Sequence, residues 1–138
     1  MAMAKQFILG PPITLQCSAP VAANRILMHD VANAGQVKQS TAASRAFVGV
    51  SDQASSGGAS STASVQVHTI AGSVVKVVAG SGGVTAGDQV ASDATGQGVT
   101  FTDAGTGTAV KTIAGIAMET AAAGELFGML ISPRTGLA

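Results

Sequence analysis

Short runs rich in Val, Ile and Thr recur along the whole chain, and Gly, Asn, Asp or Ser closes each of them. Apolar runs spaced roughly ten residues apart with turn residues between them are typical of an all-β protein. Apolar and polar residues alternate in Val65–His68 and in Val75–Val77, as they do in half-buried strands. Only the segment from Ala117 to Gly124 favours a helix by propensity, and we expect one short helical turn there at most.

The pattern therefore predicts an all-β fold, a small β-barrel or sandwich of roughly eight to ten short strands. Because a β-protein must hide or blunt its edge strands, we expect the first strands to pair with the last. The runs predicted as strands are Ile13–Cys17, Arg25–His29, Gly35–Gln39, Phe47–Ser51, Ser64–Ile70, Val74–Val78, Asp88–Ser92, Gly98–Thr102, Ile113–Met118 and Leu126–Ile131.

The chain also contains an internal duplication. Val21–Asp30 aligns with Val84–Asp93 at an offset of 63 residues, and Phe47–Ser51 aligns with Ile113–Ala117 at an offset of 66. An insertion of three residues reconciles the two offsets, and a central Gly recurs in the second pair of segments. Two copies are too few for a solenoid array, so we expect two related halves that close one barrel or sandwich.

The duplication suggests a simple domain organisation. Residues 13–138 are predicted to form a single β domain with halves at about 13–79 and 80–132. Two segments of small residues, Ala54–Ser61 and Asp103–Thr108, have nothing to bury, so we expect them to be exposed loops.

Residues 1–12 are predicted to form an extended N-terminal arm. Three large apolar residues, Phe7, Ile8 and Leu9, precede Pro11 and Pro12, which hold the backbone extended. Two interpretations remain open: the arm is the first strand of the barrel, or it docks on a partner by strand addition. In the second case these five residues are the candidate contacts with the partner.

Charge and composition exclude several classes of partner. The net charge is 0, and the seven Lys and Arg are scattered singly, whereas nucleic-acid binding needs a clustered basic surface. No apolar run approaches the roughly 20 residues of a membrane-spanning helix, and no secretory signal is visible near Met1. We therefore expect a protein that is soluble and intracellular when it is made, without nucleic-acid or membrane partners. With few large side chains and little charge repulsion, it is expected to complete its burial against neighbouring proteins.

The sequence offers little catalytic chemistry. Cys17 with His29 or His68 could form a nucleophile and base, but no orienting residue has a characteristic spacing to them. No Gly-x-Ser-x-Gly motif is present. We expect no enzyme activity, no cofactor and no metal site.

Four carboxylates at predicted turns leave one alternative open. Asp is a preferred turn residue because its side chain accepts hydrogen bonds from the following backbone, and capping of turns is the favoured interpretation. A calcium site is the second, although no EF-hand pattern is present. The residues concerned are Asp30, Asp52, Asp88 and Asp93.

Two segments in the second half carry a resemblance. Gly83–Val90 reads G-V-T-A-G-D-Q-V, and Ile113–Glu125 reads I-A-G-I-A-M-E-T-A-A-A-G-E. Followed by a terminal strand, this arrangement resembles the small capsid decoration (cement) proteins of tailed bacteriophages. The first half resembles the same family more weakly, in Phe47–Val50 and Ser64–Val67. The resemblance covers most of residues 13–132, and most of the matching residues are small. The Ser/Gly loop and the Pro-Pro arm depart from the family pattern.

The resemblance implies a structural virion protein. Proteins of this family are compact β folds, often trimeric, that sit on the outer surface of an icosahedral head and clamp adjacent major capsid proteins. They have no catalytic residues to carry over. The alternative is a β-sandwich carbohydrate- or receptor-binding module of a phage tail or host-attachment structure. It is disfavoured because sugar-binding platforms usually need Trp or Tyr, and this chain has neither.

Overall fold

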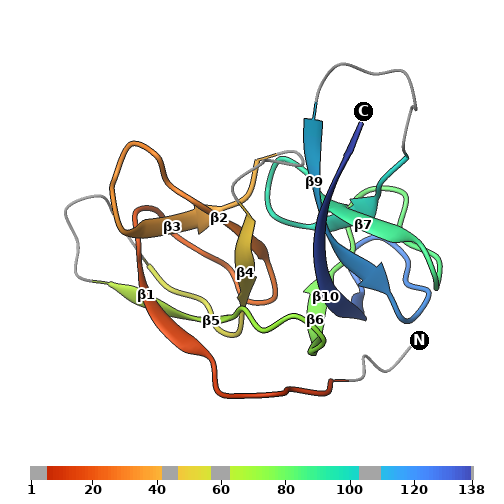
Figure 1. Ribbon diagram of the computed structural model, residues 1–138, viewed down its shortest axis with the longest axis horizontal. Helices are drawn as coiled ribbons and strands as arrows, with labels where there is room; N and C mark the ends of the chain where they lie inside the picture. Colours follow the sequence, from red (N-terminus) through yellow and green to blue (C-terminus); the bar gives the residue numbers. More distant parts are fainter. Residues whose placement is uncertain (1–5, 42–46, 57–62, 103–109, 138) are drawn as a thin grey trace.

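The computed structural model describes residues 6–41, 47–56, 63–102 and 110–137, which form ten strands in two five-stranded sheets (Figure 1). The first sheet contains β1 (Ile13–Cys17), β2 (Ile26–His29), β3 (Gln36–Gln39), β4 (Phe47–Ser51) and β5 (Ser64–His68). The second contains β6 (Val74–Val78), β7 (Gln89–Ser92), β8 (Gly98–Thr100), β9 (Val110–Ala117) and β10 (Leu126–Leu137).

The all-β prediction is confirmed. Each predicted strand is present, and the bounds of β1, β4 and β6 are as predicted. The main difference is that β9 and β10 extend beyond the predicted runs and pair with each other as far as Val110 and Leu137, past a register shift between Ile131 and Arg134. The described residues contain no helix, so the segment after Ala117 is a turn. Most of the two predicted exposed loops, 54–61 and 103–108, lies outside the described residues.

The first half closes on itself, and the expected pairing of the first strands with the last is wrong. β1 pairs with β5 in antiparallel fashion and with β3 in parallel fashion, which gives a closed barrel in the order β1-β3-β2-β4-β5. The second sheet has the order β6-β10-β9-β7-β8, and a parallel bridge joins Ala79 to Gly98. Because β1 already has a partner on each side, it needs no strand from the other half to hide its edges.

The duplication is visible in the hydrogen-bond ladders. Leu27 faces Gly49 between β2 and β4, and the aligned residues Val90 and Gly115 face each other between β7 and β9. Outside the strands, the bridge between Val21 and Ser55 is repeated by the one between Val84 and Ala121. The two units, β1–β5 and β6–β10, therefore share one strand order and register.

The units divide earlier than the predicted halves. β6 was assigned from the sequence to the end of the first half, but it pairs with β10 in the second sheet. The alternation of Val75–Val77 is the same whichever sheet the strand joins, so it does not predict the partner strand. The division between the units lies after His68 and before Val74.

A shared core joins the two units. Ile26 and Val50 of the first unit are buried in one cluster with Val77, Phe127 and other residues of the second. A smaller cluster around Leu27 and Val67 fills the first barrel. Backbone bonds reinforce the junction: Ile26 N donates to Gly96 O at 2.8 Å. The buried apolar residues are thus concentrated in the core shared by the two units and inside the first barrel. Of the described residues, none forms a helix long and apolar enough to cross a membrane.

Candidate interaction site

The N-terminal arm crosses from one unit to the other. It runs along the lower edge of the view in Figure 1, from the second sheet to β1. Phe7 N donates to Val74 O at 2.8 Å and Val74 N donates to Phe7 O at 2.7 Å, so the arm adds one bridge to the edge of β6. Leu9 N donates to Ser73 Oγ at 3.1 Å. The first strand of the barrel begins only at Ile13, so the arm is not that strand.

The five predicted contact residues divide by exposure. The side chains of Phe7 and Leu9 are 64% and 54% exposed, whereas Ile8 is partly buried and packs against the core cluster. Pro11 is exposed and Pro12 is partly buried. The arm is therefore anchored by Ile8 and presents two large apolar side chains to solvent.

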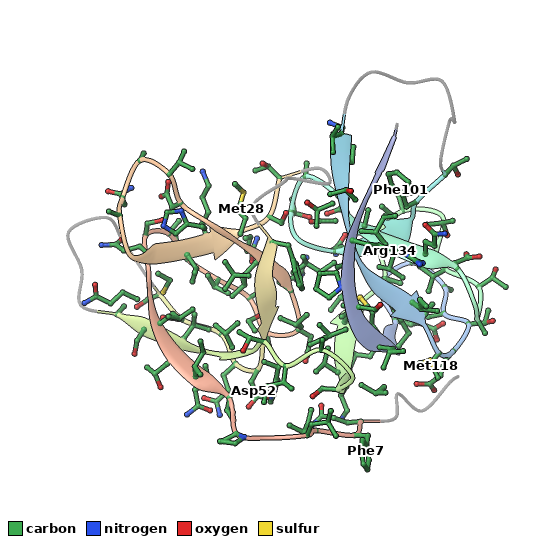
Figure 2. All side chains as sticks on the ribbon, viewed as in Figure 1. Phe7, Met28, Asp52, Phe101, Met118 and Arg134 are labelled. Carbon is green, nitrogen blue, oxygen red and sulfur yellow. The ribbon has the colours of Figure 1, made fainter. Side chains whose placement is uncertain are left out.

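A groove missed by the sequence interpretation lies beside the arm. It has a volume of about 520 Å³ and is lined by Gln6, Phe7, Val74, Met118 and Glu119. Met118 is 51% exposed, and Figure 2 shows it on the same side of the molecule as Phe7. The Glu119 carboxylate accepts a hydrogen bond from Gly128 N at 2.9 Å, which holds the turn after β9 against β10.

The three residues considered for nucleophilic chemistry differ in their burial and their contacts. Cys17 is buried, and its Sγ lies 3.2 Å from Ser55 Oγ. His68 is buried with its Nε2 3.3 Å from Asp52 Oδ1, and His29 is exposed at the end of β2. Within the described part of the chain, no hydrogen bond joins Cys17 to either histidine.

Three of the four carboxylates cap turns. Asp30 Oδ1 accepts a bond from Ala32 N at 3.0 Å, and at the aligned turn Asp93 Oδ1 accepts one from Thr95 N at 2.8 Å. Asp88 Oδ2 accepts bonds from Thr85 N and from Thr100 Oγ1. The hydrogen bond from the Thr100 hydroxyl lowers the pKa of Asp88 most, and the bond from the Thr85 backbone lowers it further. Across the described ranges no group of three or more His, Cys, Asp or Glu side chains could hold a metal ion.

Asp30 is the most strongly held of these carboxylates. It is buried, and its Oδ2 accepts bonds from Ser18 Oγ at 2.6 Å and from Asn33 Nδ2 at 2.9 Å. These bonds, with the Ser18 hydroxyl contributing most, lower the pKa of Asp30 from 3.8 to about 2. Lys38 Nζ, 3.9 Å from Oδ1, acts in the same direction.

Asp30 should therefore contribute to acid sensitivity. Its pKa is lower in the folded than in the unfolded state, so its stabilisation is complete above pH 3.8 and is lost as the pH falls through about 2. We expect the free energy of unfolding of Asp30→Asn to vary less steeply with pH in this window than that of the wild type. Urea unfolding at a series of pH values measures both slopes. Ser18→Ala should reduce the slope in part, and equal slopes for all three proteins would contradict the assignment.

Comparison with known proteins finds a likeness among solved structures. No family model matches the chain, and no curated protein matches it. Among solved structures, the fold is similar to the N base of head fiber gp8.5 of bacteriophage phi29, with a TM-score of 0.66 and 23% sequence identity over 91% of this chain and 96% of that chain. The fold is therefore shared across nearly the full length of both chains.

Proposed function

We propose that this chain is a structural protein of a bacteriophage head. The observation that carries the proposal is the fold likeness to a phage head fiber base over 91% of this chain. Gly83–Val90 and Ile113–Glu125 resemble capsid decoration proteins in sequence, independently of the fold, and this resemblance supports the same class of particle.

Within that class, we place the protein on the outer surface of the head, where it bridges neighbouring major capsid proteins and stabilises the shell. A part that binds many identical sites stabilises the assembled state by mass action, by about 2.7 kcal/mol per site at a free concentration 100 times Kd. The exposed apolar side chains of Phe7, Leu9 and Met118 would supply contact area for such binding. The net charge of 0 leaves little long-range repulsion between closely spaced copies.

The proposal extends to self-association and excludes catalysis. We propose a homotrimer, the assembly that the resemblance implies, with the major capsid protein as the other partner. We propose a binding role rather than an enzymatic one, without a cofactor. The burial of Cys17 and His68 supports this, because neither side chain is open to a substrate in solution.

Heads that lack the protein are expected to be less stable than complete heads. We expect them to release DNA at a lower temperature and to tolerate low salt less well, because the bridges between capsid subunits resist internal pressure. The measurement is DNA release during heating of complete, stripped and reconstituted heads. If stripped heads are as tolerant as complete heads, the bridging role is wrong. Adding the purified protein back should restore the wild-type release temperature.

A further inference from the structure

The two units share one architecture but differ on the outer face of one ladder. In the first unit Thr14 pairs with Gln66 between β1 and β5, and in the second Lys76 pairs with Gly128 between β6 and β10. The next outward pairs along these ladders are Gln16 with Ser64 and Val78 with Leu126. The residue that follows β4 and the residue that follows β9 are matched in the same way. Asp52 N donates to Gln66 O in the first unit, and Met118 N donates to Gly128 O in the second.

The orientation of these residues follows from strand alternation. Val75 and Val77 of β6 are buried in the core, while the alternate residues Val74, Lys76 and Val78 are partly exposed. Directly opposed residues of an antiparallel pair lie on the same face. The partners of the partly exposed residues, including Leu126 and Leu130, therefore lie on the outer face as well.

The first unit keeps this outer face polar. Thr14, Gln16, Ser64 and Gln66 are all exposed, and Asp52 stands at the turn beside them. The fold of the unit therefore does not require apolar residues at these positions.

The second unit carries large apolar side chains at three of the five matched positions, Val78, Leu126 and Met118, and has Lys76 and Gly128 at the other two. A row crosses the sheet on one face through the partners Phe7, Val74, Leu130 and Ile116. Met118, at the position of Asp52, lines the groove beside this row. Because the first unit folds with polar residues at the positions of Val78, Leu126 and Met118, a binding role explains these three residues.

We infer that the outer face of the second unit docks an extended segment of the shell protein that carries a large apolar side chain beside a carboxylate. The inference rests on the proposed function. The groove of about 520 Å³ is in the range of pockets that hold a ligand group, about 300–1,000 Å³. Lys76 lies on this face and forms no ion pair among the described residues, so an acidic side chain would complement it.

The arm adds a main-chain component to this surface. Phe7 uses its N–H and C=O groups toward Val74. In an antiparallel arrangement the groups of the next residue, Ile8, then point to the opposite edge, away from β6. An extended partner segment could pair there by strand addition while its side chain enters the groove.

The test replaces residues on the outer face of the second unit with the polar residues found at the aligned positions of the first unit. Met118→Asp and Leu126→Ser install the residues found at the aligned positions, Asp52 and Ser64. Lys76→Glu reverses the charge, and Lys76→Arg preserves it. Gln66→Glu places a new charge on the first face as the matched control. Binding of each variant to stripped heads is measured by co-sedimentation, alongside its thermal unfolding and its mass in solution.

We expect Met118→Asp and Lys76→Glu each to raise Kd for heads by about tenfold or more, with Lys76→Arg and Gln66→Glu close to the wild type. If the wild type binds and Met118→Asp and Lys76→Glu bind equally well, the inference is wrong while the proposed function stands. If the wild type does not bind heads, both are wrong. If Met118→Asp instead lowers the mass in solution, the face joins copies of this chain, and the inference of a shell partner is overturned.

Discussion

Replacing Gly115 with alanine is expected to lower the free energy of unfolding by about 3 kcal/mol or more, at the upper end of overpacking costs. A Cβ at this position would overlap the carbonyl oxygen of Leu130 and lie 2.9 Å from its carbonyl carbon. These are backbone atoms of the paired strand β10, so no side-chain rotation relieves the contact. Strands β9 and β10 would have to separate where Leu130 pairs with Ile116. Chemical denaturation of the wild type and the variant measures the loss.

The duplication supplies a second copy of this experiment. Gly49 is the aligned residue, and its Cβ would overlap the carbonyl oxygen of His68 and lie 2.7 Å from Val67 Cγ1. We expect Gly49→Ala to be destabilising for the same reason. Gly124→Ala is the control, because its Cβ would meet nothing within 4 Å and its cost should come from the positive φ of 85° alone, about 1–2 kcal/mol. A smaller loss for Gly115→Ala than for Gly124→Ala would contradict the close-approach explanation.

The strands were predictable because their signals are local. Alternation and turn residues define a run such as Phe47–Ser51 without knowledge of its partners, and β4 has those bounds. The duplication was equally readable, since the two offsets found in the sequence also relate the bridges of Val21 and Val84.

Strand partners were not predictable in the same way. The parallel pairing of β1 with β3 joins segments that are separated by β2, and no residue in either strand encodes that choice. For the same reason β6 was assigned to the wrong half. The extension of β9 and β10 was missed because Ser132 and Pro133 interrupt the pattern, and the ladder resumes beyond them at Arg134.

The candidate site was predictable only in part. The arm was visible because Phe7 and Leu9 stand next to two prolines. Met118 was missed because its neighbours Thr120 to Ala123 favour a helix by propensity, although the segment is a turn. A comparison of the two halves at outward positions would have found it, since Met118 aligns with Asp52. When two duplicated units share the residues that form the fold, positions where they differ on the outer face therefore indicate a binding surface.

Replacing Phe7 and Leu9 together with serine is expected to weaken binding to heads by at least about 30-fold, the effect of losing one hot-spot side chain. The two side chains are 64% and 54% exposed, so the free energy of unfolding should change by less than about 1 kcal/mol. Binding and stability are therefore separable in this variant. Co-sedimentation with stripped heads measures the first, and thermal unfolding measures the second.

Deletion of residues 1–12 would test the same surface less cleanly. It also removes Ile8 from the core cluster and breaks both hydrogen bonds between Phe7 and Val74. Val31→Ser is the better control, because Val31 is an apolar residue that is 81% exposed and lies outside the arm. A docking arm requires that the double variant binds weakly while Val31→Ser binds normally. If the double variant and the deletion both bind heads like the wild type and only the deletion is less stable, the arm is a clamp between the two units and has no part in docking.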